Sequence, residues 1–433
     1  MAMRWTANPF TLVRFQVSSP NLRKQMLISK HFCPQPFVYI YPNHDGSWKP
    51  CCKAGTYPKK NMSFDEWWYE DQDLNDLRKA LLSDEWSQPL EDVCGPCFGP
   101  ESRGVKSYRQ FQVETWSEPL AKGKIERLIS FFKHTGEVQA GERMFIVQVK
   151  GIGNQCNLKC YMCAPHNSTS RTTELLKGTK ETAELFYKGK GMSRLIFNKT
   201  AYLNTDSEKK QLFDVIEELG PYIKKLNFSG GEPAMIGNYY DLMDKIIETG
   251  NSKHIQIFMN SNLTRLNLKN RSMADYFPRF DRFDIQASVD DIFERDEYIR
   301  YPSKFKKVLE NYQYLNSINN VNMSINVTWS LLNAANAENI CDFFTENKYR
   351  ISRMTNFVSN PIELHVKNHP LKDELMERFK ESKYRTVREV ALEMNDKYNE
   401  LEFFKAVAYI KDLDRIRNTQ SWKVFPELSN WLK

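Results

Sequence analysis

Long apolar runs are absent from this sequence of 433 residues. No run approaches the ~18 consecutive apolar residues that a membrane-spanning helix needs. Residues 1–16 also lack the apolar stretch and the small-residue cleavage site of a signal peptide. We therefore expect a cytoplasmic protein without a membrane span. Repeats of fixed period and low-complexity tracts are missing as well, which argues against a repeat architecture.

A block of like charge is also missing. The chain has 61 Lys and Arg against 54 Asp and Glu, for a formal net charge of +7, and the two signs are mixed along its length. This pattern is typical of a solvated, mildly basic surface. It gives only weak support for a nucleic-acid partner, which stays open as an alternative.

Cysteine, by contrast, is abundant and grouped. Eight of the nine cysteines fall in tight groups: Cys33; Cys51 and Cys52; Cys94 and Cys97; and Cys156, Cys160 and Cys163. In a cytoplasmic protein, grouped cysteines indicate metal ligands before disulfides. Cys341 stands alone in an amphipathic segment, and we expect it to be a buried core thiol.

From Met144 onward, short apolar runs alternate with amphipathic segments. This rhythm predicts βα units around a parallel sheet, either closed into a barrel or doubly wound, with the active site at the carboxyl ends of the strands. The expected strands are 145–149, 225–228, 255–259, 283–287, 323–328 and 354–358. The expected helices are 209–219, 240–249 and 305–315.

Cys156-Asn-Leu-Lys-Cys160-Tyr-Met-Cys163 follows the first of these strands and a Gly-Ile-Gly stretch at 151–153. Spacings of three and two residues let three thiolates reach three irons of a cubane cluster. No fourth ligand stands nearby, so one coordination position stays open, as catalysis at a metal requires. The alternative is a zinc knuckle, which usually uses two CxxC pairs.

A second motif, Ser229-Gly230-Gly231-Glu232-Pro233, directly follows the strand expected at 225–228. Two glycines let the backbone approach a ligand without a Cβ in the way. A carboxylate at this position can accept hydrogen bonds from an ammonium group.

These two motifs resemble the CX3CX2C and GGEP elements of the radical S-adenosylmethionine superfamily, over about residues 144–358. The resemblance implies a partial (β/α)6 TIM-like barrel and a [4Fe-4S] cluster held by Cys156, Cys160 and Cys163. It also implies that S-adenosylmethionine binds the open iron and is cleaved reductively. The resulting 5′-deoxyadenosyl radical abstracts hydrogen from a substrate.

The resemblance also implies a set of cofactor-binding residues. This sequence differs from many family members, because Met162 and not an aromatic residue precedes the third cysteine. Ordinary turn or surface chemistry stays the alternative for the later positions, as it does for Asn333, and a helix cap is the alternative for Asp290 and Asp291. The implied residues are Tyr161, Met162, Ser229, Gly230, Gly231, Glu232, Asn260, Ser261, Ser288 and Arg300. Asn260 and Ser261 belong to the turn Asn260-Ser261-Asn262, which resembles the family's polar turn near the cofactor ribose.

The upstream cysteines form a second pattern. Cys33 is followed after twelve residues by Gly46 and after four more by Cys51, and Cys94-Gly-Pro-Cys97 comes later. The spacing predicts a β-hairpin turned by Asp45-Gly46 with thiols at its feet. Four thiolates can hold either an iron–sulfur cluster or a zinc ion.

This pattern resembles the SPASM and twitch auxiliary-cluster domains, which implies a second [4Fe-4S] cluster on Cys33, Cys51, Cys94 and Cys97. Such domains usually follow the barrel, whereas this one precedes it, and cysteines for a further auxiliary cluster are absent. Cys52 stays open as a ligand in place of Cys51, and structural zinc stays the alternative. The resemblance continues through Phe64, Trp67, Trp68, Leu77, Arg78, Glu101, Gly104, Ser107 and Arg109.

We expect three parts: a cysteine-rich auxiliary-cluster domain at 1–120, the barrel at 140–365 and a helical extension at 366–433. In the extension, Asp414, Arg417, Trp422 and the segment 425–428 are expected to pack against the barrel. The family resemblance implies a peptide or protein substrate and a small electron donor such as flavodoxin or ferredoxin. The alternatives are modification of a nucleotide or nucleic acid, and an iron–sulfur electron carrier without turnover.

Overall fold

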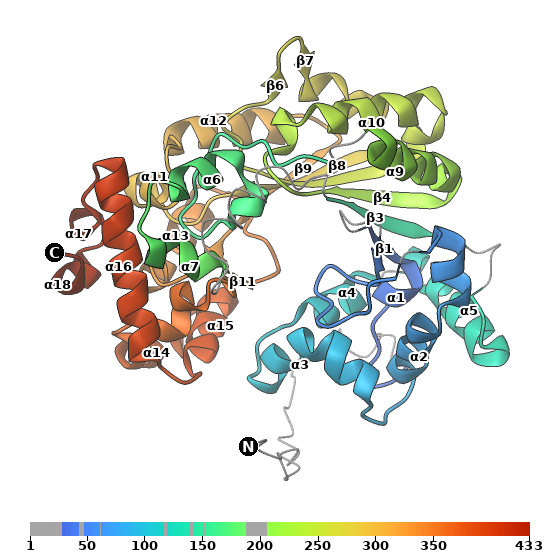
Figure 1. The fold of residues 1–433 in the computed structure, drawn as a ribbon, viewed down its shortest axis with the longest axis horizontal. Coiled ribbons are helices and arrows are strands. Elements are labelled where there is room, and N and C mark those ends of the chain that lie inside the picture. Colours follow the sequence, from blue (N-terminus) through green and yellow to red (C-terminus); the bar gives the residue numbers. More distant parts are fainter. Residues whose placement is uncertain are drawn as a thin grey trace.

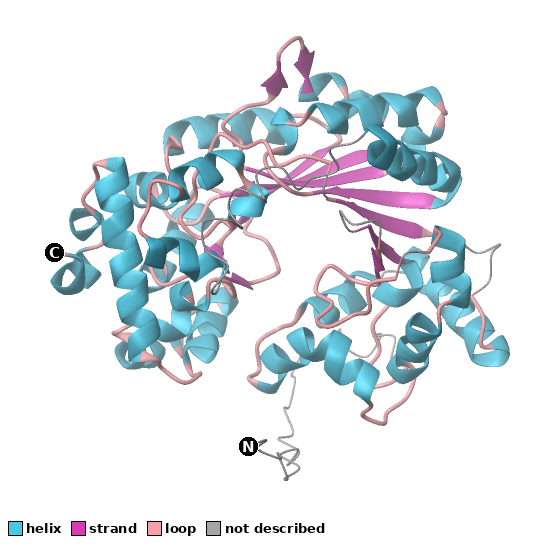
Figure 2. Ribbon diagram, viewed as in Figure 1, coloured by secondary structure: helices cyan, strands magenta, loops and turns pink. Residues whose placement is uncertain are grey.

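The computed structural model describes residues 28–42, 47–60, 62–116, 119–138, 143–150, 152–187 and 206–433. The fold is organised by one seven-stranded sheet of order β2-β1-β3-β4-β5-β8-β9, in which only the β1–β2 pair is antiparallel (Figures 1 and 2). Its strands are β1 (Tyr39–Pro42), β2 (Trp48–Lys49), β3 (Phe145–Val149), β4 (Ile223–Phe228), β5 (Gln256–Ser261), β8 (Arg282–Ser288) and β9 (Val321–Asn326).

All six strands expected after Met144 are confirmed. The last of them is short: β11 (Asn356–Phe357) pairs in parallel only with β10 (Thr328–Trp329), which continues the direction of β9. A second small pair, β6 (Asn267–Leu268) and β7 (Arg271–Ser272), forms a hairpin outside the main sheet. The α/β fold with a mostly parallel sheet is therefore consistent with the expected partial barrel.

Helices cover the outer face of this sheet (Figure 1). The three expected helices are confirmed as α9, α10 and α12, and Cys341 is fully buried in α13, as expected. The helices of this half are α6 (Thr169–Leu175), α7 (Lys180–Tyr187), α9 (Asp206–Leu219), α10 (Gly237–Glu248), α11 (Phe293–Ile299), α12 (Phe305–Asn316) and α13 (Ala337–Glu346).

The inner face of the sheet, opposite the face that the helices cover, is more accessible and more polar than the outer face. Exposure alternates residue by residue along β5 and β8, so that one face is buried and the other is partly accessible. Parallel sheets are usually buried and apolar on both faces. Here the accessible positions, apart from Phe258, carry polar side chains, among them Asn260, Gln286 and Ser288, so the inner face is suited to a polar ligand.

The cysteine-rich segment is joined directly to this sheet. Its strand β1 pairs in parallel with β3, and the expected hairpin is confirmed by the antiparallel β1–β2 pair. The turn expected at Asp45-Gly46 lies outside the described residues, as does Gly151. The helices of this part are α1 (Gln35–Val38), α2 (Gln72–Leu81), α3 (Gly95–Ser102), α4 (Tyr108–Trp116) and α5 (Pro119–Thr135).

The carboxyl-terminal segment is helical, as expected, and lies at the opposite end of the molecule from α1–α5 (Figure 1). Its buried face shares one hydrophobic cluster with Tyr161 and Leu175. Within the described residues, no helix has the length and apolar character needed to cross a membrane. The helices are α14 (Lys372–Phe379), α15 (Arg385–Met394), α16 (Glu400–Arg417), α17 (Ser421–Val424) and α18 (Ser429–Leu432).

Candidate functional site

A cavity of about 260 Å³ opens where β3, β4, β5 and β8 end. This is the edge at which parallel α/β sheets bind their ligands. The structure brings ten of the predicted residues into its wall: Cys156, Cys160, Cys163, Ser229, Gly230, Gly231, Glu232, Asn260, Ser288 and Arg300. The other lining residues are Lys150, Leu158, Asn167 and Asn262.

All three thiols of the loop are free, and Cys160 is buried. Burial raises the pKa of Cys156 and of Cys163 to about 12, and the nearby charge of Cys160 contributes to both increases. Thiols with so high a pKa release protons when a metal binds. Nowhere in the described part of the chain do three Cys, His, Asp or Glu side chains converge closely enough for a single metal ion. A cubane offers its irons at separate corners, so the open three-thiol wall fits a cluster better than one ion.

Gly231 lies against the cysteine loop. A Cβ built on Gly231 would lie 2.2 Å from the carbonyl oxygen of Gln155 and 2.6 Å from the carbonyl carbon of Asn154. The N–H of Glu232 donates to that same Gln155 oxygen at 2.7 Å. From the sequence, we expect a glycine here because the backbone approaches a ligand. The structure adds a second reason, since the backbones of two site loops pack directly against each other at Gly231.

The Glu232 carboxylate is 1% exposed, and burial raises its pKa to about 7. Three donors already reach it: the Ser261 hydroxyl at 2.7 Å and the N–H groups of Asn262 at 2.6 Å and Ala234 at 3.3 Å. These bonds oppose the effect of burial on the pKa. The carboxylate thus ties the ends of β4 and β5 together, which also explains why Ser261 lies behind the cavity wall.

Arg300, which also lines the cavity, is held by Asp290. Its Nη1 donates to Asp290 Oδ2 at 2.6 Å, while its buried Nε has no partner among the described residues. The other carboxylate oxygen, Asp290 Oδ1, accepts from the Thr328 N–H at 2.9 Å. The helix-cap alternative therefore does not describe Asp290. An oriented guanidinium with a spare donor suits a carboxylate ligand.

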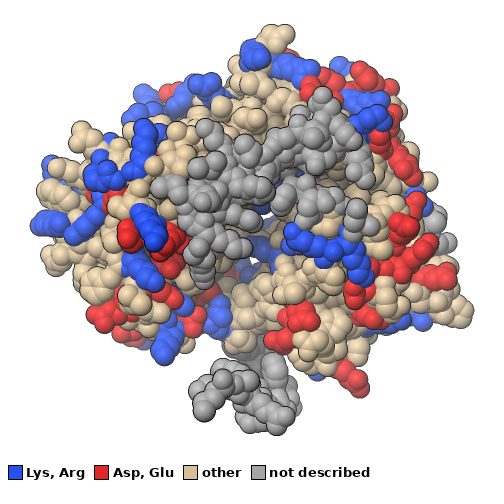
Figure 3. All heavy atoms as spheres, viewed as in Figure 1, with Lys and Arg blue, Asp and Glu red and all other residues tan. Residues whose placement is uncertain are grey.

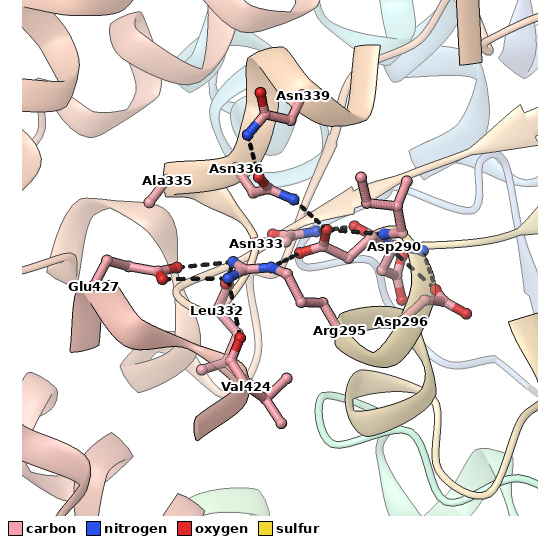
Figure 4. Close-up of polar contacts among 12 residues, drawn as sticks. Asp290, Arg295, Asp296, Leu332, Asn333, Ala335, Asn336, Asn339, Val424 and Glu427 are labelled. Atoms are coloured by element: carbon pink, nitrogen blue, oxygen red, sulfur yellow. Dashed lines mark hydrogen bonds and ion pairs between the residues drawn. The ribbon is translucent and has the colours of Figure 1, made fainter. Parts of the chain in front are cut away.

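A polar network supports this arrangement (Figure 4). Asn333 donates to the backbone carbonyl of Asp290 at 2.6 Å, so this candidate residue braces the site instead of lining it. Arg295 bridges Asp291, at 2.8 Å, and Glu427, at 2.8 Å. The carboxyl-terminal segment is thereby linked to the loop that carries Asp290.

The backbone carbonyls of the cysteine loop accept hydrogen bonds on the side of the loop that faces away from the cavity. Ser170 and Ser168 donate to the carbonyls of Cys156 and Leu158 at 2.6 and 2.9 Å. Arg417, at the end of α16, donates to the Lys159 carbonyl. The Tyr161 carbonyl accepts hydrogen bonds from the Arg171 guanidinium, at 3.2 Å, and from the Tyr409 hydroxyl. Buried carbonyls need such donors, so α6 and α16 together fix the loop.

Glu174 connects the two arginines of this support. It forms an ion pair with Arg171 and accepts from Arg417 at 2.9 Å through each oxygen, and all three side chains are at most 1% exposed. Burial alone would raise the pKa of Glu174, but Arg417 and Arg171 outweigh it and hold the pKa below its usual value. Packing of Arg417 against the barrel, expected from the sequence, is confirmed.

Besides Ser261, two of the predicted cofactor residues are not brought to the cavity. The Tyr161 side chain is fully buried in the cluster shared with α16, and Met162 packs against the same cluster. The backbone of the loop is anchored on both sides of Tyr161, since its N–H donates to the Ile299 carbonyl at 2.9 Å. This anchoring turns the side chain into the core.

The upstream cysteines lie near one another. Cys33 and Cys97 are buried, and Cys51 and Cys94 are partly exposed. Burial raises the pKa of the Cys33 thiol, and the nearby Cys94 and Cys97 raise it further. Cys51 is also within electrostatic reach of Cys33. No three of these described thiols converge as closely as a single metal ion requires, so the four-thiol site, with a cluster or with zinc, stays a prediction.

Residues 151–344 match the family profile of the Radical SAM superfamily. This stretch contains the cysteine loop, the Gly231 contact and the Asp290–Arg300 pair described above. The chain is a radical SAM superfamily enzyme. A [4Fe-4S] cluster and S-adenosylmethionine are the cofactors that this family implies.

Solved structures similar to this radical SAM enzyme include anSMEcpe with bound AdoMet, with 15% identity over 63% of this chain and 62% of that one, and a TM-score of 0.33. Another is Streptococcus suis SuiB bound to precursor peptide SuiA, with 13% identity over 71% and 56% and a TM-score of 0.35. The chain thus spans less than two thirds of their lengths, and likeness at this level carries no argument about substrate. No curated protein matches the chain.

Lys150 and Asn167 of this radical SAM enzyme line the cavity but are not among the residues predicted from the sequence, whereas Asn262 belongs to the polar turn at 260–262 that the resemblance indicated. Lys150 and Asn262 directly follow β3 and β5, so their place after a strand was the available signal. No sequence pattern indicates that Glu174 supports the site, because its partner Arg417 is 243 residues away.

Replacing Gly231 by Ala tests the packing of the two loops. We expect a loss of about 2–3 kcal/mol in unfolding free energy, because the new methyl group overlaps a backbone carbonyl. The measurement is denaturant unfolding of the cluster-free protein. Gly237→Ala is the matched control, since its Cβ would lie 3.9 Å from the nearest atom and should cost nothing measurable. Equal unfolding curves for the two variants would contradict the assignment.

Replacing Glu174 by Gln tests the buried ion cluster. We expect a loss of about 3–5 kcal/mol, because two buried guanidinium groups are left without a carboxylate. The pKa of Glu174 is lowered in the folded protein, so this stability is present above the usual carboxyl range and is lost as the pH falls through the folded pKa. Urea unfolding at several pH values measures it. The exposed Glu184→Gln, whose partner is Lys180, should match the wild type at each pH.

Proposed function

We propose that this radical SAM enzyme cleaves S-adenosylmethionine reductively at a [4Fe-4S] cluster held by Cys156, Cys160 and Cys163, and abstracts hydrogen from a residue of a peptide or protein. The observation that carries the proposal is the common cavity of the three thiols and the Ser229–Glu232 loop. When bound, the cluster supplies the electron for cleavage of the cofactor.

The chain's own residues would bind and orient the cofactor. Arg300 and Ser288 are proposed to hold its carboxylate, and Asp290 keeps the guanidinium turned toward the cavity. Ser229, Gly230 and Gly231 would offer backbone groups to its amino group. Glu232 braces this loop, since its oxygens already accept three hydrogen bonds.

We further propose that β3, β4, β5, β8, β9 and β11 are the strands of a partial (β/α)6 barrel, spanning 140–365. The segment 1–120 is proposed as an auxiliary-cluster domain with a second [4Fe-4S] cluster on Cys33, Cys51, Cys94 and Cys97. The helical segment 366–433 is proposed as a support for the cysteine loop. A small electron donor of the flavodoxin or ferredoxin kind would reduce the enzyme.

The peptide substrate rests on the sequence resemblance to SPASM and twitch proteins and on the polar inner face of the sheet. Amide side chains such as Asn227 and Gln286 can each donate and accept, which matches the N–H and C=O groups of a peptide backbone.

Cleavage of the cofactor tests the proposal. The protein is reconstituted with iron and sulfide without oxygen and mixed with S-adenosylmethionine and dithionite. We expect 5′-deoxyadenosine from the wild type and none from Cys160→Ala, because two thiolates do not hold the cluster in place. Cys341→Ala, which changes a core thiol, should retain the product. An intact cluster without 5′-deoxyadenosine would favour an electron carrier instead.

A further inference from the structure

Lys150 stands in the cavity without an acidic partner. It directly follows β3, is partly buried and lines the same wall as the three thiols. Among the residues that the structure describes, no Asp or Glu forms an ion pair with Lys150, Lys49 or Lys53. A partly buried cation that no carboxylate neutralises is costly, so such a side chain suits an anionic ligand.

Strand register places Lys49 on the same face as Lys150. Side chains alternate along a strand, so Ile146, Gln148 and Lys150 share the inner face of the sheet. Tyr39 is paired with Ile146, and its hydroxyl donates to Gln148 at 2.7 Å, so Tyr39 also faces inward. Tyr41 follows two residues later on the same side.

Lys49 is the cross-strand partner of Tyr41 and therefore projects from the inner face as well. Its strand, β2, is two strands from β3, a separation of roughly 10 Å that two lysine side chains can span. Burial lowers the pKa of Lys150, and the charges of Lys49 and Lys53 lower it further, whereas Cys52 and Cys163 oppose them. The strand register therefore places Lys49 and Lys150 on one face of the sheet, within reach of one anion.

This basic group is separate from the place proposed for the cofactor's carboxylate. Ser288 lies at the end of β8, three strands from β3 in the sheet order, or about 14 Å along the sheet. One carboxylate group does not reach both ends of that span. In the space-filling view, Lys and Arg atoms border the central hollow, whereas over the rest of this face the two signs are mixed (Figure 3).

We infer that Lys49 and Lys150 form a binding site for a carboxylate side chain of the substrate, so that the enzyme takes an acidic peptide segment. This inference rests on the proposed function. A peptide is favoured over a nucleic acid because the charge is confined to one place beside amide side chains. A phosphate backbone needs a longer basic surface.

Fluorescence anisotropy with two short fluorescein-labelled peptides tests the site. One peptide carries Glu at alternate positions between Gly and Ala, and the other carries Gln at the same positions. The reconstituted wild type should bind the Glu peptide at least about tenfold more tightly than the Gln peptide, equivalent to about 1.4 kcal/mol. The Lys49→Gln/Lys150→Gln double variant should lose that preference.

Two further variants separate charge from folding. Lys49→Arg/Lys150→Arg keeps both positive charges and should keep the preference. Lys306→Gln/Lys405→Gln removes two exposed lysines elsewhere and should bind like the wild type. The inference is overturned if the wild type shows no preference, or if both double Gln variants lose it equally.

Other arms of the experiment decide between ligands. A labelled single-stranded oligonucleotide that binds more tightly than the Glu peptide, and through the same lysines, would overturn the peptide assignment. A weaker affinity for S-adenosylmethionine in Lys150→Gln, with unchanged peptide affinity, would assign this lysine to the cofactor. 5′-Deoxyadenosine formation by the wild type is measured in parallel, so failure of the proposed function is seen independently of peptide binding.

Discussion

The buried carboxylate of Glu174 is the contact on which the geometry of the site depends. It forms ion pairs with both Arg171 and Arg417, and these two arginines donate to carbonyls on either side of Cys160. A loop that presents three thiols toward a cavity turns its carbonyls the other way, into the protein. Without charged donors there, those carbonyls would be buried and unpaired. The ion cluster therefore sets the position of the thiols although none of its members faces the cavity.

This dependence gives the two ends of the chain distinct structural roles. The carboxyl-terminal α16 supplies Arg417 and Tyr409 to the back of the cysteine loop. The amino-terminal segment adds β1 and β2 to the edge of the sheet beside β3, next to the loop's beginning. The ends also meet each other, because Arg103 forms an ion pair with Glu393 at 2.8 Å. The polar inner face of the sheet is thus bordered by both ends of the chain.

Local patterns predict much of this arrangement. The strands after Met144 follow from short apolar runs, and Cys156, Gly231 and Arg300 follow from motifs placed after strands. Contacts between distant segments are not predictable in this way. Glu174 looks like an ordinary helical acid until Arg417, 243 residues later, is folded against it. Tyr161 stands inside the motif, yet tertiary anchoring of its backbone turns it into the core. Lys150 belongs to no sequence motif and is identified as a site residue only because it lines the cavity.

The central claim is that the loop held by Glu174 carries an iron–sulfur cluster on three thiolates. Diffraction from crystals of the reconstituted protein at the iron absorption edge tests it most directly. The account predicts anomalous density for a four-iron cluster against Cys156, Cys160 and Cys163, with one iron lacking a protein ligand. A single tetrahedral metal ion at this loop, or iron confined to the upstream cysteines, would contradict it.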